Sequence, residues 1–204
     1  MRTHFLKPGD NNLIIKRLSN LFLEDSDLHI AVAYFNSEYF AELIIERAKK
    51  KQKNLLILNT SDLIRPKEAG KSEIVISKAL IKILKHEGNY IFCKSLGLKV
   101  RGNYQNMHHK FIFTQNKLFF GSLNLTDAAI NRNFESLIET ENNFLIKKFH
   151  SEFGKLWNIG SELYSDRDGK LRSIMCPKCE NSDGVDFESF GPICHMCGYN
   201  FIVD

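Results

Sequence analysis

The apolar residues of the chain fall into alternating strand-like and helix-like segments. Short, nearly continuous apolar runs, which are typical of buried strands, occupy residues 27–35, 54–60 and 89–96. Apolar residues at helical spacing follow the first two runs, at 37–53 and at 73–86. This strand–helix–strand–helix–strand order predicts an α/β fold with a mixed, partly parallel sheet flanked by helices.

The same patterns predict further elements on either side of these. A helix is expected around residues 12–22, and residues 134–142 alternate like a strand. Residues 126–129 predict a short helical turn, and residues 144–163 predict a closing amphipathic helix. The polar residues that follow this helix predict a linker.

The composition is that of a globular protein, with 43% hydrophobic and 25% charged residues among 204. No apolar run approaches the roughly 20 residues that span a bilayer. The first residues lack the apolar core of a secretory signal. We therefore expect a soluble, cytoplasmic protein that has no membrane partner.

The net charge of +4 is unevenly distributed. The first 165 residues hold 24 basic and 17 acidic side chains, whereas residues 166–204 hold four basic and seven acidic ones. A basic body suits an anionic partner such as nucleic acid, although a solvated surface would have the same charge.

The C-terminal segment contains two CxxC pairs, formed by Cys176, Cys179, Cys194 and Cys197. Two such pairs can complete a tetrahedron of thiolates around Zn²⁺, and the 14 residues between them suit a zinc ribbon. Disulfides or redox cysteines are the alternatives, and a cytoplasmic protein disfavours disulfides. We predict a main domain at 1–163, a linker at 164–174 and a ribbon with structural zinc at 175–204.

The role of this ribbon is less determined. Its acidic side chains and four thiolates disfavour a simple phosphate clamp. A further protein partner or a contact with nucleic-acid bases therefore fits as well. The fifth cysteine, Cys93, lies in an apolar run and predicts a buried core thiol.

The stretch NMHHKFIFTQNKLFFGSLN carries polar side chains at its two ends. If residues 115–117 form a three-residue hairpin turn, His108 opposes Asn124 and Lys110 opposes Ser122. All four side chains then share one face of a strand pair, because residues i and i+2 point the same way. His109 points to the opposite face.

An imidazole, an ammonium, a hydroxyl and an amide on one face make a phosphate site. Lys110, Ser122 and Asn124 can donate hydrogen bonds to phosphate oxygens, and His108 can attack phosphorus or donate a proton. The alternative is a basic hairpin that carries incidental polar residues.

These motifs resemble a known family. HHK with GSLN resembles the HxK…GSxN signature of the phospholipase D superfamily, and most closely its short, single-motif branch of Nuc-type endonucleases. Asn133-Phe134-Glu135 resembles the N-x-E that follows in this branch. The resemblance covers roughly residues 10–160 and implies a phospholipase D-like fold.

The resemblance also implies residue roles. His108 matches the histidine that forms a covalent phosphohistidine, and Lys110 and Asn124 match the phosphate-binding pair. Ser122 matches a supporting residue, and Glu135 matches a carboxylate that orients a histidine. The family cleaves phosphodiesters of nucleic acids or phospholipids and needs no catalytic metal.

The sequence departs from the family pattern near the expected turn. Gln115 stands where the family motif has Asp, and the interval from there to Gly121 is one residue shorter. Strand parity places Gln115 away from His108, so we interpret its change as one of turn support.

The proposed chemistry needs two histidines, one to attack and one to protonate the leaving oxygen. No second HxK occurs in the chain. A two-fold homodimer would bring His108 of each chain to a shared site, and the resemblance implies the same arrangement.

Residues near this stretch add candidate substrate contacts. Lys99 and Arg101 suit flanking phosphates, and Tyr104 suits stacking on a base, although the segment can also be an ordinary polar loop.

We therefore predict a metal-independent nuclease for DNA or RNA, with restriction or antiviral defence as a role by analogy. The alternatives are a non-catalytic nucleic-acid-binding or scaffold subunit, and a phospholipase.

Overall fold

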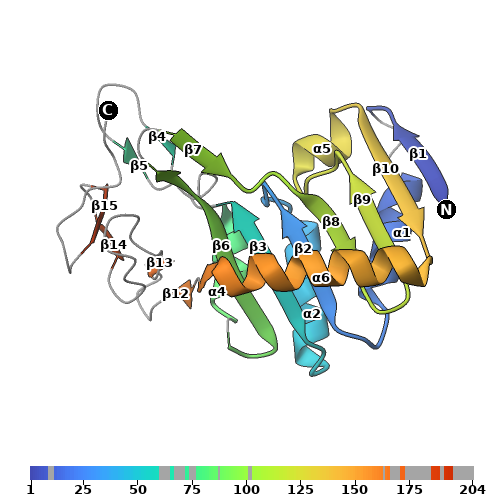
Figure 1. The fold of residues 1–204 in the computed structure, drawn as a ribbon, viewed down its shortest axis with the longest axis horizontal. Coiled ribbons are helices and arrows are strands. Elements are labelled where there is room, and N and C mark those ends of the chain that lie inside the picture. Colours follow the sequence, from blue (N-terminus) through green and yellow to red (C-terminus); the bar gives the residue numbers. More distant parts are fainter. Residues whose placement is uncertain are drawn as a thin grey trace.

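The computed structural model places one main layered body and a few short strands beside it (Figure 1). The described residues are 1–8, 12–59, 65–66, 72–73, 77–86, 88–100, 103–162, 164–165, 171–172, 185–188 and 191–194.

The main sheet is mixed. Its strands lie in the order β1 (Arg2–Leu6), β10 (Glu135–Thr140), β9 (Leu118–Gly121), β8 (Lys110–Phe113), β2 (Leu28–Val32), β3 (Asn54–Asn59), β6 (Ile91–Val100) and β11 (Ser161–Glu162). The central strands β2, β3 and β6 are parallel, and every other neighbouring pair is antiparallel. Strand β7 (Asn103–Asn106) pairs with β6 in an antiparallel hairpin. The predicted mixed sheet flanked by helices is confirmed.

Helices cover both faces of this sheet. Helices α1 (Asn12–Phe22), α2 (Glu38–Lys49) and α4 (Lys78–Leu84) lie on one face, and α6 (Asn143–Ile159) crosses the other (Figure 1). The short α5 (Asp127–Asn131) follows β9 and is capped by Thr126, whose side chain accepts a hydrogen bond from Ala129 N. Among the described residues, no helix is both long enough and apolar enough to cross a bilayer.

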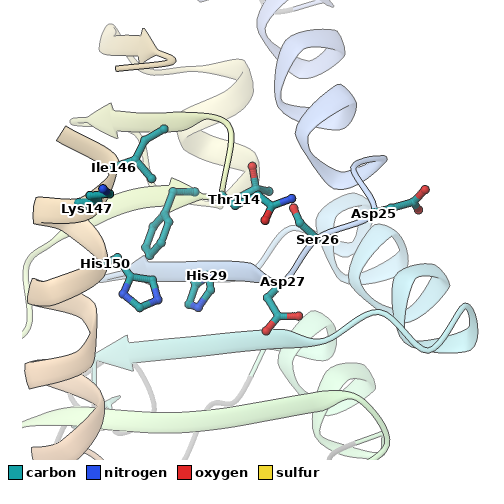
Figure 2. Close-up of a pocket in the computed structure, with 10 residues that line it drawn as sticks. Asp25, Ser26, Asp27, His29, Thr114, Ile146, Lys147 and His150 are labelled. Carbon is teal, nitrogen blue, oxygen red and sulfur yellow. The ribbon is translucent and has the colours of Figure 1, made fainter. Parts of the chain in front are cut away.

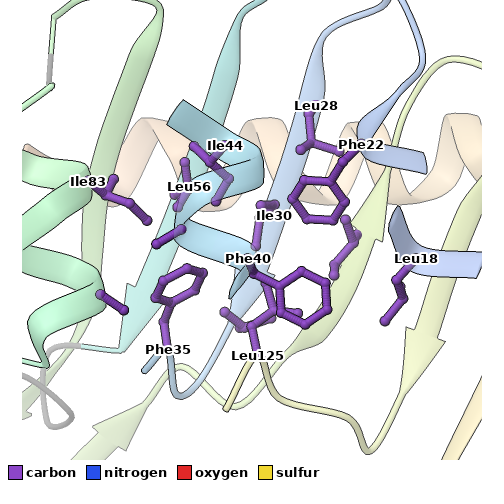
Figure 3. Packing of buried hydrophobic residues seen from close by; sticks show 14 of the residues in the cluster. Leu18, Phe22, Leu28, Ile30, Phe35, Phe40, Ile44, Leu56, Ile83 and Leu125 are labelled. Carbon is purple, nitrogen blue, oxygen red and sulfur yellow. The ribbon is translucent and has the colours of Figure 1, made fainter. Parts of the chain in front are cut away.

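Alternation along the strands divides the core between these two faces. Ile30 and Leu56 pack with Phe22 and Phe40 under α1 and α2 (Figure 3), and Ile112 belongs to the same cluster. Their neighbours along the strands face α6 instead, where the cluster is rich in phenylalanine. Because both faces are covered, the central strands are mostly apolar, which is why they are recognisable in the sequence. Cys93 is buried in the first cluster, as predicted.

Some element boundaries differ from those predicted. The edge strand β1 is not predicted, because only its last residue, Leu6, is buried, and the sequence has little apolar signal there. Helix α4 begins at Lys78 rather than at 73, since Ser77 caps its first turn by accepting a hydrogen bond from Leu80 N. Helix α6 ends at Ile159, and the next residues pair with β6 as β11.

The remaining strands are short. Strands β4 (Arg65–Pro66) and β5 (Ser72–Glu73) pair with each other. Strands β12 (Tyr164–Ser165), β13 (Leu171–Arg172), β14 (Val185–Glu188) and β15 (Gly191–Cys194) form a separate antiparallel sheet. Two of these strands lie inside the range predicted as a linker.

The predicted zinc ligands are mostly beyond what the structure describes. Cys176, Cys179 and Cys197 lie outside the described residues, and Cys194 is described only as the last residue of β15, opposite Val185. The zinc ribbon therefore stays a prediction.

Candidate active site

Several strands bring their polar ends to one edge of the main sheet. Because β8 and β10 run opposite to β2 and β9, the carboxyl ends of β2 and β9 meet the amino ends of β8 and β10. The two ends of the HHK…GSLN stretch therefore lie at the same edge as Glu135, the first residue of β10.

His108 and Lys110 lie where β8 begins. Lys110 pairs with Val32 in the sheet, and its Nζ donates to the His108 carbonyl at 3.0 Å. His108 is exposed. Continuing the β2–β8 register by one pair on the same face places His108 opposite Tyr34. The His108 imidazole and the Lys110 ammonium thus lie at the same edge.

His109 is separated from that pair. Its ring lies 5.6 Å from the ring of Phe111, which belongs to the cluster beneath α6. Strand parity predicts this placement. His109 is also exposed, so it is accessible to solvent without sharing the face of Lys110.

Glu135 binds polar side chains on the β9–β10 side of this edge. Its carboxylate accepts hydrogen bonds from the Ser122 hydroxyl and, at 3.2 Å, from Asn133 Nδ2. The Ser122 Oγ in turn accepts the Ser136 amide at 2.9 Å. These contacts hold the serine and the carboxylate together. The predicted role of Glu135 in orienting a histidine stays a prediction.

Asn124 is held by the segment that follows β2. Its Oδ1 accepts the Tyr34 amide at 3.1 Å, and the next residue, Leu125, forms a bridge with Phe35. Since Oδ1 is engaged, Nδ2 is the end of the amide that can donate to a phosphate. The contribution of Tyr34 could not be found from the sequence, because it acts through its backbone.

Lys110 and Glu135 are electrostatically linked. Partial burial lowers the pKa of Lys110 from its ordinary value, and the Glu135 carboxylate opposes that shift. The carboxylate therefore helps to keep the ammonium charged beside the edge where an anionic substrate would lie.

The hairpin register differs from the one predicted, and that prediction is wrong. Phe113 pairs with Leu118, and the Thr114 amide donates to the Lys117 carbonyl at 2.9 Å, so the loop has two residues rather than three. The Thr114 Oγ1 accepts the amides of Asn116 and Lys117, both at 3.3 Å. This side chain supplies the acceptor that tightens the turn.

The shorter loop changes how the polar side chains come together. Continued by one pair, the observed register places Lys110 opposite Gly121 rather than Ser122. A Cβ at Gly121 would lie 2.1 Å from the Ser136 carbonyl oxygen, so the backbones approach too closely for a side chain. Ser122 and Asn124 therefore reach the edge through the bend after Gly121 and not from a flat strand face.

The other predicted residues have separate outcomes. Gln115 lies in the turn at the far end of β8 from Lys110, as expected. Lys99 and Tyr104 pair with each other across β6 and β7, but their side chains are not among those described. Arg101 lies outside the described residues.

A hollow lies at the other end of these strands, away from the candidate active site. It has a volume of about 510 Å³ and is lined by residues that include Asp27, His29 and His150. The imidazoles of His29 and His150 are neighbours in this hollow (Figure 2). Their ring centroids are 5.4 Å apart. His29 lies near the start of β2, whereas Tyr34 follows the end of that strand. This hollow is therefore separate from the candidate active site.

We expect His29 to make the fold sensitive to acid. Its pKa falls from 6.5 to about 4, first because burial disfavours the charged ring and then because His150 repels it. The folded state therefore prefers neutral His29. Its contribution to stability is complete above the unfolded pKa and is lost as the pH falls from 6.5 toward 4.

Urea unfolding at pH 7 and pH 4.5 measures this effect. From pH 7 to pH 4.5 the free energy of unfolding should fall by about 1–3 kcal/mol more in the wild type than in His29→Phe. The phenylalanine keeps a ring against Phe113 but has no proton to gain. Equal losses in the two proteins would show that His29 is not the group responsible.

Comparison with known proteins identifies the family of this arrangement. A family model described as "Cardiolipin synthase, PLD-like domain" matches residues 22–157, which include the whole candidate site. The chain is also 41% identical over 68 residues to mitochondrial cardiolipin hydrolase of Danio rerio. That match covers 31% of this chain and 30% of the relative.

Solved structures share the fold. NucT from Helicobacter pylori aligns with a TM-score of 0.62 and 20% identity over 78% of this chain and 97% of its own. Nuc from Salmonella typhimurium, a phospholipase D family member, aligns with a TM-score of 0.62 and 16% identity, over 80% of this chain and 99% of its own.

Proposed function

Because the chain belongs to the PLD-like domain family, a family of phosphodiesterases, we propose that it is a metal-independent nuclease acting on DNA or RNA. The observation that carries this proposal is the edge at which His108, Lys110 and Asn124 lie near the Ser122–Glu135 pair. This set combines a nucleophile with donors for phosphate oxygens.

The proposed reaction has two displacements at phosphorus. The neutral His108 imidazole attacks, a nitrogen–phosphorus bond forms, and the bond to the leaving oxygen breaks as that oxygen takes a proton. Water then attacks phosphorus, its proton is removed by a base, and the nitrogen–phosphorus bond breaks. Lys110 and Asn124 Nδ2 donate to the non-bridging oxygens throughout.

A homodimer would supply the second histidine. Each chain has a single HxK, and a two-fold axis beside the exposed His108 would bring two of these imidazoles to one phosphate. One would attack while the other, protonated, would donate to the leaving oxygen. A monomer that retained full activity at working concentration would exclude this shared site.

Nucleic acid is the favoured substrate. The net charge is +4, and the two structural relatives that the chain covers almost completely are NucT and Nuc. The partial match to a protein named cardiolipin hydrolase is the specific observation that favours a phospholipid substrate instead. Both possibilities use the same phosphodiester chemistry.

Structural zinc is the proposed cofactor of the C-terminal segment. The two CxxC pairs supply four thiolates, which would complete the coordination of Zn²⁺ and leave no open position for catalysis. We propose that this ribbon binds a further protein partner. Metal analysis of the purified protein should give about one zinc per chain.

Cleavage assays in brief EDTA test the proposed function. The dimer is expected to cleave DNA or RNA at the same rate with and without chelator, since no step uses a metal. Cardiolipin vesicles serve as the second substrate. Hydrolysis of cardiolipin alone would replace the nuclease by a phospholipase, and absence of cleavage of every phosphodiester would favour a non-catalytic binding subunit.

A further inference from the structure

A hollow of about 420 Å³ adjoins the candidate active site on the α6 side of the sheet. Leu96 and Gly97 of β6 form one side, and Leu156 and Ile159 of the last turns of α6 form another. The segment 107–109 completes it. Most of this lining is apolar.

The two adjacent histidines connect the hollow to the site. His108 lines the hollow and also lies in the candidate active site beside Lys110. His109 lines the same hollow with its ring held near Phe111. A group attached to the phosphate attacked by His108 can therefore extend directly toward His109.

We propose that this hollow binds the base of a nucleotide that flanks the scissile phosphate, and that the His109 ring stacks on it. The inference rests on the proposed nuclease function and extends it to a base-binding subsite. In a nucleic acid each internal phosphate lies between two nucleosides, so a base is always one sugar away from the attacked phosphorus. His109, which the chemistry leaves unused, thereby becomes a substrate-binding residue.

The lining suits the planar face of a base. Imidazole and aliphatic side chains make stacking and dispersion contacts that every base can accept. Bases are distinguished by hydrogen bonds to their edges. Besides His108, which the proposed reaction uses, His109 is the polar side chain of this lining, so strong discrimination between bases is not expected. This subsite should tolerate any sequence.

A lipid chain fits the same hollow less well. In a glycerophospholipid the acyl chains are separated from the phosphate by a polar glycerol, and they need a long apolar channel. Here two exposed imidazoles stand beside the apolar residues, and Ile159 is itself 62% exposed at the rim. The nucleobase is therefore the occupant that the surface favours.

Steady-state cleavage of two oligonucleotides of equal length tests the proposal. One carries ordinary nucleotides, and the other carries abasic tetrahydrofuran units along its length. For the ordinary substrate, His109→Ala is expected to raise KM about 10-fold with kcat within about twofold, which corresponds to the loss of one stacked base. For the abasic substrate, KM should not change.

Matched variants separate stacking from general damage. His109→Phe should restore most of the preference for the base-containing substrate, because it keeps an aromatic face. His86→Ala removes another exposed histidine that does not line the hollow, and it should behave as wild type. Equal effects of His109→Ala on both substrates, or no effect on either, would overturn the proposal.

The outcomes also distinguish this subsite from the proposed function. If the wild type cleaves neither oligonucleotide, the nuclease proposal fails, and binding of the two oligonucleotides by fluorescence anisotropy still tests the base site. If Leu156→Ser slows hydrolysis of cardiolipin vesicles while both oligonucleotides bind equally, the occupant is an acyl chain and the base site is excluded.

Discussion

Replacing His108 by alanine is expected to lower phosphodiester cleavage by at least about 10³-fold, because it removes the proposed nucleophile and proton donor from both halves of the dimer. The measurement is kcat on the abasic oligonucleotide in EDTA. This substrate isolates the chemical step, since it has no base to occupy the adjoining hollow.

The adjacent histidine provides the control. His109→Ala removes the same group one residue away, but its ring lies with Phe111 and not with Lys110. Cleavage of the abasic substrate should therefore stay within about twofold of the wild type. If His109→Ala abolished that cleavage and His108→Ala did not, the assignment of the two histidines would be reversed.

Replacing Arg47 by methionine is expected to destabilise the fold by about 3–5 kcal/mol. The Arg47 side chain is 2% exposed and donates hydrogen bonds to the carbonyls of Phe22, Glu24 and Ser26 and to Asn54 Oδ1. These contacts join the end of α1 and the loop between α1 and β2 to α2 and β3. Methionine keeps the volume but leaves the buried acceptors without partners.

Urea denaturation of both proteins at pH 7 measures this difference. Lys49→Met is the matched control, because Lys49 lies in the same helix but has a 62% exposed side chain, which pairs with Glu46 at 2.6 Å. It should change stability by less than about 1 kcal/mol. A similarly small change for Arg47→Met would mean that its hydrogen bonds are replaced by water.

The buried strands and the family could be predicted from the sequence. Strands that are covered on both faces must be apolar, so β2, β3 and most of β6 stand out in the chain. The HHK and GSLN motifs indicated the phospholipase D superfamily, and the match of the family model to residues 22–157 confirms that prediction. Parity along β8 also separated His109 from Lys110.

What could not be predicted depends on single backbone and side-chain contacts. The hairpin loop is shorter than expected because the Thr114 hydroxyl accepts two turn amides, which no hydrophobic pattern records. Arg47 lies in a helix rich in charge, and nothing in its sequence position indicates that it is buried. The hollow beside His109 combines β6, α6 and the segment before β8, so only the fold reveals it.

The stereochemistry of cleavage at phosphorus tests the covalent mechanism most directly. A dinucleotide phosphorothioate of one configuration is hydrolysed in ¹⁸O-labelled water, and the configuration of the product is determined. Two in-line displacements, by His108 and then by water, each invert phosphorus, so overall retention is expected. Overall inversion would show a single direct attack by water and would contradict a phosphohistidine intermediate at His108.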